Sequence, residues 1–480
     1  MELNANINIS KLALKALIGG SDDIIFFDFT CGEYDACAVY VDSITDRDML
    51  GMEVISPLKK IEGKHTVKEL SKSVTLANVE LVSEIRTIAD LVLGGHTAIL
   101  FDGKKKALSV DLKKFETRSI AEPPTGFSIR GPRSGFTESI KTNLSLMRRY
   151  LKTDDFIVEM SEVGKMTKTG VALLYIKGIA DENLVKGVRA RLGKIKTDGV
   201  PDSSYIAKHI NERRGSLFKQ VGSTERPDVM LERLLEGRVG IIVDGSPFVL
   251  TLPYLLVVDF QSAEDYYISK YRANVVRAIR IIALLFSILL PSLFVSAQLF
   301  HIQLLPQNFL LTIINSIKGI PLSPSLEMFF ILLIFEILNE TSVRMPKYVG
   351  MALGVVGALV LGETLVHAGI VSTPAVLIMA LSGISIYTVP EIVETTSILR
   401  LIFLILAGSV GGYGIILISA FMLCYFTTSD NYGVPYLAPY APLIASDMQD
   451  GFQMKSITDM KRRPVVFASR NKTRRGNENA

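Results

Sequence analysis

The sequence predicts an α/β cytoplasmic region of two duplicated lobes, followed by an all-α polytopic membrane domain. Charged side chains are frequent up to about residue 278, but no Asp, Glu, Lys or Arg occurs from Ile281 to Ile317 or from Leu401 to Ser429. Between Tyr348 and Val389 the only such residue is Glu363. About 20 apolar residues suffice for a helix to cross a bilayer, where backbone groups must bond to each other. Two parts of the charged region also match each other in sequence.

Composition and charge limit the classes of function that this protein can have. The 480 residues carry a net charge of +4, with 21% charged residues, so we expect no nucleic-acid partner. No apolar segment follows Met1, which argues against a cleaved signal peptide and places the N-terminal module in the cytoplasm. The basic residues Arg272, Arg277 and Arg280 precede the first apolar run, as expected of a cytoplasmic flank.

The first lobe, residues 1–121, and the second, residues 151–270, repeat one pattern. Val39–Asp46 aligns without a gap with Leu174–Asp181, and each segment ends a buried strand at an Asp suited to cap a helix. Further along, Gly95–Gly103 resembles Gly237–Gly245, and each contains the Asp-Gly pair that is typical of a hairpin turn. Amphipathic helices are expected before both hairpins, over Val79–Val92 and Asp228–Leu235.

Residues 122–150 are interpreted as a Pro/Gly-rich connector and a linking helix. The helix is expected to begin near Thr137, with Ile140, Leu144 and Met147 on one face. Two interpretations of the repeated lobes stay open: a larger scaffold, or a clamshell whose cleft binds a ligand.

The membrane domain, residues 271–430, is predicted to contain four or five spans, at about 278–301, 326–344, 347–370, 374–389 and 400–428. Leu304–Ile320 is short and is interpreted as a re-entrant or interfacial segment. Ser409–Gly414 resembles a potassium-channel filter sequence, but its place inside a long apolar run favours one continuous helix. A polar, basic tail follows over residues 431–480, and the side of the membrane on which it lies is left open.

Glu336, Glu340 and Arg344 follow each other at intervals of four and share one face of the second span. Charges in a bilayer normally face a protein interior or a water-filled path. Two hypotheses follow: a buried pair of Glu340 with Arg344 that joins helices, or a role in ion conduction.

The third span carries a stripe of glycines, Gly350, Gly354, Gly357 and Gly362, which allows close helix contact. Its other side ends in Val360, Leu361 and Glu363. Around an oligomer axis, the two apolar residues would form a constriction and the acidic residue would favour cations.

No catalytic motif is found. The five histidines are scattered, and the three cysteines, Cys31, Cys37 and Cys424, form neither a zinc-binding pattern nor a disulfide framework. We therefore expect no enzyme activity, no metal site and no cofactor.

Several segments together resemble the A subunit of spore germinant receptors, the GerA family. They are Arg130–Glu138 with Asn143 and Arg148–Arg149, Thr224–Asp228, Val243–Phe248, Asp265–Tyr267 and the spacing Glu336, Glu340, Arg344, Pro346. The positions that carry the signature are Arg130, Gly131, Pro132, Glu138, Asn143, Glu225, Arg226, Pro227, Asp244 and Pro247.

The resemblance implies a multi-pass protein of the spore inner membrane whose N-terminal region faces the spore core. It implies a homo-oligomer, as a pentamer, that works with a transporter-like B subunit that senses nutrient and with a lipoprotein C subunit, in contact with membrane lipid. Nutrient binding would open a cation channel and trigger germination. The alternatives are a non-conducting scaffold or signal-transducing subunit, a solute transporter subunit, and an accessory, SpoVAF-like branch of the family. The sequence does not name the nutrient.

Overall fold

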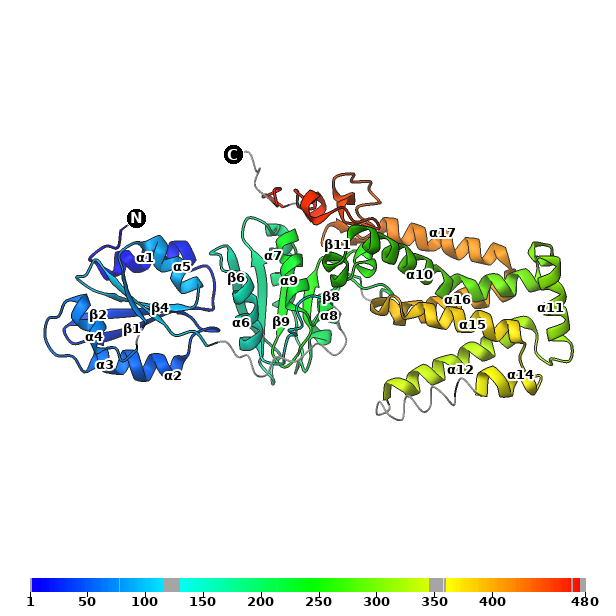
Figure 1. Cartoon of the computed structure of the whole chain (residues 1–480), viewed down its shortest axis with the longest axis horizontal. Helices are drawn as coiled ribbons and strands as arrows, with labels where there is room; N and C mark the ends of the chain where they lie inside the picture. Colours follow the sequence, from blue (N-terminus) through cyan, green and yellow to red (C-terminus); the bar gives the residue numbers. More distant parts are fainter. Residues whose placement is uncertain are drawn as a thin grey trace.

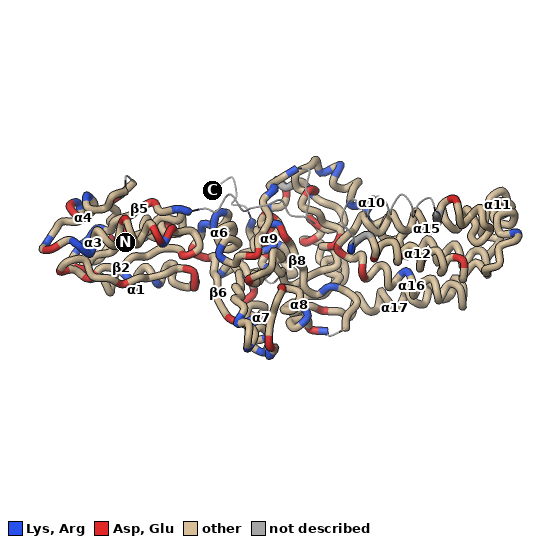
Figure 2. The backbone as a smooth tube through the Cα atoms, turned by 90° about the horizontal axis from the view of Figure 1, so that it is seen from below, with Lys and Arg blue, Asp and Glu red and all other residues tan. Residues whose placement is uncertain are grey.

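The computed structural model describes residues 2–76, 78–114, 130–213, 215–344, 357, 360–467 and 469–474. The molecule is elongated, with two α/β lobes and a helical region arranged one after another along its long axis (Figure 1). Charged residues are dense on the lobes and sparse along the helical region (Figure 2).

The first lobe is a five-stranded antiparallel sheet covered by helices on both faces. Its strand order is β1-β2-β4-β5-β3, with every neighbouring pair antiparallel. Its elements are α1 Ile7–Ile18, β1 Ile24–Cys31, β2 Tyr34–Val41, α2 Arg47–Met49, the π-helical turn η1 Leu50–Ile55, α3 Ser56–Lys59, α4 Val67–Ser73, β3 Val79–Val82, α5 Ile85–Leu93, β4 His96–Phe101 and β5 Ala107–Asp111.

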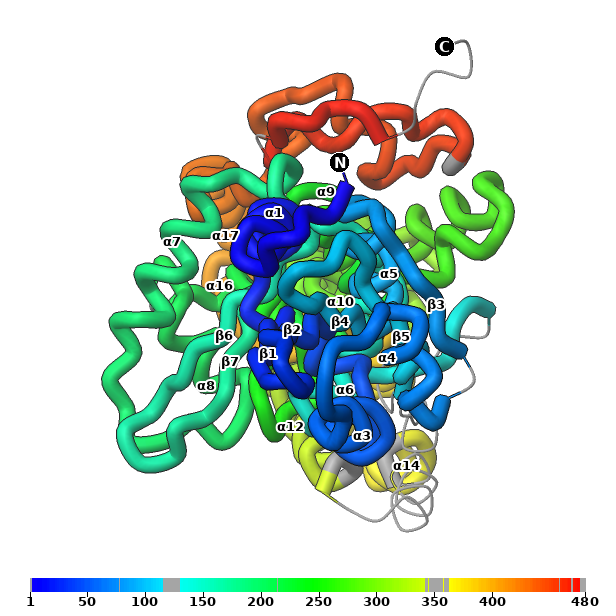
Figure 3. Tube along the Cα trace, turned by 90° about the vertical axis from the view of Figure 1, so that its left-hand side faces the viewer, coloured from blue at the N-terminus to red at the C-terminus, as the bar shows by residue number. Residues whose placement is uncertain are grey.

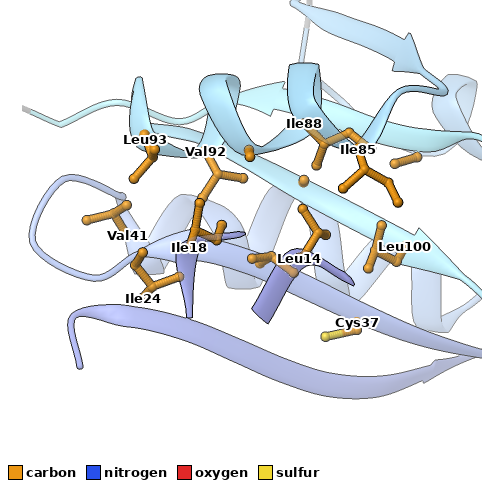
Figure 4. Close-up of a cluster of buried hydrophobic side chains, with 14 of the residues drawn as sticks. Leu14, Ile18, Ile24, Cys37, Val41, Ile85, Ile88, Val92, Leu93 and Leu100 are labelled. Carbon is orange, nitrogen blue, oxygen red and sulfur yellow. The ribbon is translucent and has the colours of Figure 1, made fainter. Parts of the chain in front are cut away.

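Alternation along the strands divides the core of this lobe into two layers. Cys37, Val39 and Val41 of β2 face α1 and α5, as Figure 4 illustrates, whereas Ala38 and Tyr40 face η1, α3 and α4. Successive strand residues point to opposite faces of a sheet, so β2, which is buried from Ala36 to Val41, contributes side chains to both layers.

The second lobe has the same order of helices and strands. Its sheet order is β6-β7-β9-β10-β8. The elements are α6 Ile140–Tyr150, β6 Phe156–Val163, β7 Thr169–Ile176, α7 Glu182–Leu192, α8 Ser203–Ile210, β8 Gly222–Thr224, α9 Pro227–Glu236, β9 Val239–Val243 and β10 Val249–Leu252. The helix α6 packs with α9 on one face of this sheet, in the place that α1 takes in the first lobe.

Two details differ from the predicted elements. Val79–Val82 is not helical; it pairs with β5 as the edge strand β3, because sheet pairing outweighs the helical periodicity of this short segment. The helix α6 is capped by Ser139, whose hydroxyl accepts a hydrogen bond from Thr142 N, and not by Thr137.

The described part of residues 270–428 contains only helices. They are α10 Lys270–Leu299, η4 Ile302–Leu304, α11 Gln307–Ile317, α12 Pro324–Arg344, η5 Val360–Thr364, α14 Leu365–His367, α15 Thr373–Ile386, η6 Pro390–Ile392, α16 Val393–Val410 and α17 Gly412–Thr428. In the described residues, Lys270–Leu299 and Pro390–Val410 are long and apolar enough to cross a membrane. At 11 residues, α11 is roughly 17 Å long, too short to cross.

The expectation of one continuous helix over 400–428 is wrong. Gly411 has a φ of +70° and separates α16 from α17, which run side by side in opposite directions (Figure 1). A side chain at this position would also meet the ring of Phe300, so the chain reverses where only glycine fits.

The tail after α17 returns to the second lobe. It forms a small hairpin, β11 Asp430–Asn431 and β12 Val434–Pro435, and three short 3₁₀ turns, η7 Asp447–Gln449, η8 Ile457–Asp459 and η9 Val465–Phe467. Arg463 Nε donates to Leu235 O at 2.8 Å. Seen from the lobe end, the tail runs along one side of the molecule (Figure 3). The lobes and the tail therefore lie at the same end of the helical region.

A buried ion pair joins the two lobes. The guanidinium of Arg148 in α6 lies 2.7 and 2.9 Å from the two carboxylate oxygens of Asp23, and it donates to Ser21 Oγ at 2.8 Å. Ser21 Oγ in turn accepts from Val158 N in β6. The Arg148 side chain is fully buried over the ring of Phe156.

We expect Arg148→Ala to lower the free energy of unfolding of the lobes by about 3–5 kcal/mol, because it leaves Asp23 buried without its partner. Lys152→Ala, at an exposed position shortly after α6, should change this free energy by less than about 0.5 kcal/mol. Denaturant titration of the purified chain measures both values. Equal effects of the two substitutions would contradict the assignment of this contact.

Candidate functional site

The site that the fold assembles is the junction between the second lobe and the helices. Two short 3₁₀ turns, η2 Leu256–Phe260 and η3 Ala263–Tyr267, lead from the last strand into α10. Asp265 is fully buried there and accepts from Arg277 Nε at 2.9 Å and from two nitrogens of Arg280 at 2.8 and 3.0 Å. These are two of the three basic residues expected to flank the first span; they are paired inside the protein.

The tail completes this cluster. Asp450 accepts from Arg277 at 2.8 Å and from the hydroxyl of Tyr266, and Arg277 also donates to Gly451 O at 2.6 Å. Two carboxylates and two guanidinium groups thus balance each other, with Asp265 and Arg277 fully buried and Arg280 and Asp450 partly exposed. Removing Asp265 would leave Arg280 without its carboxylate and the buried Arg277 with Asp450 alone.

A second contact is made by the loop after α8, here called the docking loop (residues 211–213 and 215–220). Phe218 packs against the aromatic rings of Tyr425 and Phe426 near the end of α17. Arg213 donates to Thr428 O and Ser429 Oγ at 2.8 and 2.9 Å. The docking loop therefore holds the C-terminal end of α17 against the second lobe.

The same loop holds the start of α16. Thr395 Oγ1 donates to Leu217 O at 2.6 Å, and Lys219 Nζ lies 2.7 Å from Glu391 in η6. The start of α16 and the end of α17 thus both contact one loop of the second lobe.

A buried carboxyl lies beside this loop. Asp259 in η2 accepts a hydrogen bond from Tyr254 Oη, and its other oxygen is buried without a hydrogen-bond partner. Burial raises the pKa of Asp259 to about 7, although Tyr254 and Lys219 act in the opposite direction.

The positions of the predicted signature come together on the second lobe. Pro132 O accepts from Arg226, which also forms a two-pronged pair with Asp228 at 2.7 and 3.0 Å. Tyr267 Oη donates to the same carboxylate at 2.8 Å. A side chain at Gly131, whose φ is +112°, would meet the Tyr267 ring. The segment after the connector is thereby tied to α9 and to η3.

Further signature positions hold the same segment on its other side. Asn143 is fully buried and clasps the backbone N–H and carbonyl of Thr137 at 2.7 and 2.6 Å. Asp244 accepts from Ile140 N at 3.1 Å, and the carbonyl of Glu138 accepts from Gly245 N.

The remaining signature positions act through the backbone or lie nearby. The carbonyl of Glu225 accepts from Phe136 N, Pro227 is the first residue of α9, and Pro247 follows the turn after β9. Arg130 is exposed at the start of the described segment. In the described part of the chain, the contacts of these residues tie the segment after the connector to the second lobe.

The intramembrane charges are paired differently from the prediction. Glu340 and Arg344 do form an ion pair, but their side chains are 65% and 77% exposed, so among the described residues the pair is not buried between helices. Glu336 instead reaches Arg400 in α16, whose side chain is fully buried. No sequence pattern indicates this pair, because Arg400 stands immediately before a charge-free run and no spacing relates it to Glu336.

The predicted pore residues lie in the short π-helical turn η5, which contains Val360, Leu361 and Glu363. Glu363 is exposed. Gly357 is buried against α12, where an added Cβ would lie 3.0 Å from Leu338 Cδ1. Gly350, Gly354 and most of the rest of this predicted span fall outside the described residues.

Within the described part of the chain, no group of three or more His, Cys, Asp or Glu side chains is placed to hold a metal ion. Cys31 and Cys37 are buried, and Cys424 is exposed on α17.

Comparison with known proteins decides the family. The family model described as "Bacillus/Clostridium GerA spore germination protein" matches residues 12–466. The chain belongs to the GerA family of spore germination proteins. Spore germination protein KA of Bacillus subtilis (strain 168) is 37% identical over 474 residues, covering 97% of this chain and 87% of the relative.

Other family members align as fully. Spore germination protein B1 of Bacillus subtilis (strain 168) is 32% identical, over 97% of this chain and 98% of the relative. Spore germination protein GerLA of Bacillus cereus is 31% identical, over 100% of this chain and 99% of the relative. A crystal structure of the N-terminal domain of the A subunit of the Bacillus megaterium spore germinant receptor GerK3 matches with 31% identity and a TM-score of 0.42, covering 53% of this chain and 98% of that chain.

The Asp259 carboxyl predicts a pH dependence of stability. Its pKa of about 7 in the folded state exceeds the ordinary 3.8, so the folded state binds the proton more tightly between these values. Stability should therefore fall as the pH rises from about 4 to 7 and then level off. An Asn at position 259 stays neutral, so the Asp259→Asn variant should not lose stability in this way. The difference between its free energy of unfolding and that of the wild type should therefore grow as the pH rises to about 7.

Denaturant titration of both proteins from pH 4 to 8 measures this difference. Burial also raises the pKa of Glu232 to about 7. Because Glu232 is present in both proteins, its contribution to the pH dependence cancels in the comparison. Parallel stability profiles would contradict the assignment to Asp259.

Proposed function

We propose that this chain is the A subunit of a nutrient-responsive spore germination receptor and forms, as a homo-oligomer, a cation channel in the spore inner membrane. The observation that carries the proposal is the family match over residues 12–466, which includes both lobes and the helical region. A transporter-like B subunit that senses nutrient and a lipoprotein C subunit complete the receptor.

The helical region supplies the membrane domain of this proposal. Two helices have the length and composition to span a bilayer, and α15 and α17 are shorter apolar helices. Because the lobes and the tail lie at the same end, the chain crosses the membrane an even number of times, with both on the spore-core side. The lobes arise in this account from an internal duplication, which their shared strand order supports.

The gate of the proposed channel is the turn that contains Val360 and Leu361, next to the exposed Glu363. Apolar side chains at a narrow point exclude water and ions, and an acidic ring beside them favours cations. Nutrient binding to the B subunit opens the gate only to the extent that the open state binds nutrient more tightly.

A non-conducting scaffold is the second candidate, since the described contacts of the signature residues hold the second lobe together. Cation flux separates the two functions. Liposomes that contain this chain with its B and C partners should release K⁺ when nutrient is added, and liposomes without this chain should not. A stable, nutrient-binding complex without flux would overturn the channel and favour the scaffold.

Val360→Ala and Leu361→Ala should raise K⁺ leak in the absence of nutrient, because each shortens an apolar side chain at the constriction. The same variants should cause premature germination of spores. Leu377→Ala, at an exposed position of α15, provides a matched control that should not leak. Wild-type dormancy and wild-type leak in both gate variants would remove these residues from the pore.

A further inference from the structure

A series of contacts runs from the second lobe to Gly357, three residues before the proposed gate. It begins at the docking loop, where Thr395 of α16 donates to Leu217 O and Lys219 pairs with Glu391. These contacts fix the start of α16 relative to the soluble region. Movement of the loop therefore displaces α16.

The next contact crosses from α16 to α12 through Arg400. This residue lies five positions after Thr395 and is fully buried, with one nitrogen on Glu336 of α12 and another 3.3 Å from Ser382 Oγ of α15. Its guanidinium also lies over the Phe335 ring, 5.4 Å from the centroid. A buried charge of this kind stays where its partner is, since separation would leave both groups unpaired in an apolar surrounding.

The Ser382 hydroxyl adds a fourth helix to this contact, because it donates to Ser287 O of α10 at 2.8 Å. Arg400 is thus the point where α16, α15 and α12 meet, next to α10. The planar guanidinium of Arg can donate to two partners through different nitrogens, and the single ammonium group of Lys does not reproduce this geometry.

The last contact lies just before the proposed gate in the sequence. Leu338 lies two residues after Glu336 on α12, and Gly357 packs directly against it. Gly357 stands three residues before Val360. The absence of a side chain at 357 allows this close approach, so Gly357 is held against α12 at a point three residues before η5.

We propose that Arg400 and Glu336 are positioning residues that transmit the state of the docking loop to the Val360–Glu363 turn. This inference rests on the proposed channel function. The ion pair acts through α12 and touches no permeating ion. Its role is to make α16 and α12 move together, so that a shift of the soluble region alters the gate.

The test uses the full receptor in liposomes, with nutrient-induced K⁺ release as the first measurement. Arg400→Gln should reduce the nutrient-induced release by roughly 2- to 30-fold, the range expected for loss of one coupling contact. The charge exchange Glu336→Arg with Arg400→Glu should restore a large part of it, and Arg400→Lys should restore less. Glu394→Gln, an exposed carboxylate on the same helix, is the control and should behave as wild type.

A second measurement follows the contact itself and does not depend on conduction. In a Cys424→Ser background, Leu338→Cys and Gly357→Cys are joined with a short thiol-specific crosslinker. The crosslink should form in the otherwise wild-type chain, weaken with Arg400→Gln and return with the charge exchange.

These measurements separate the two proposals. Absence of nutrient-induced release from the wild-type receptor, with the crosslink responding as expected, would overturn the channel but retain the positioning role. Normal release with a crosslink and a response unchanged by Arg400→Gln would overturn the positioning role but retain the channel. A charge exchange that restores neither the K⁺ release nor the crosslink would also contradict the proposed role of the Arg400–Glu336 pair.

Discussion

The ionic cluster around Asp265 is the interaction on which the arrangement of this protein depends. It lies where a water-soluble lobe changes into apolar helices, and it joins three separate segments: the turn before α10, α10 itself through Arg277 and Arg280, and the tail through Asp450. Because Asp265 and Arg277 are fully buried, each needs its charged partners, and this requirement favours keeping the three segments together. The lobe, the first helix and the tail are thereby joined at this point.

The signature residues of the family hold neighbouring segments in a comparable way. Residues such as Asn143, Arg226 and Asp244 bind neighbouring backbone and side chains and hold the segment that connects the lobes. They act where the chain enters the second lobe, whereas the Asp265 cluster acts where it leaves that lobe for α10.

Those parts of the fold that depend on short, local sequence patterns could be predicted from the sequence. The match of Val39–Asp46 with Leu174–Asp181 coincides with the ends of β2 and β7, and Asp46 and Asp181 cap the helices that follow. The site was less accessible because its pairs are distant in the chain. Nothing in the spacing relates Glu336 to Arg400, and the reversal at Gly411 is hidden inside an apolar run whose composition equally suits one helix.

The central claim, that the charged junction joins lobe, first helix and tail into one unit, is tested most directly by hydrogen exchange of the whole chain in nanodiscs. Asp265→Asn should speed exchange together in residues 256–267, in the first turns of α10 and in residues 447–454, because all three depend on one cluster. Asp459→Asn, at an exposed position of the tail, should leave them unchanged. Faster exchange confined to residues 263–267 would contradict the claim and would mean that the lobe, the helix and the tail are held independently.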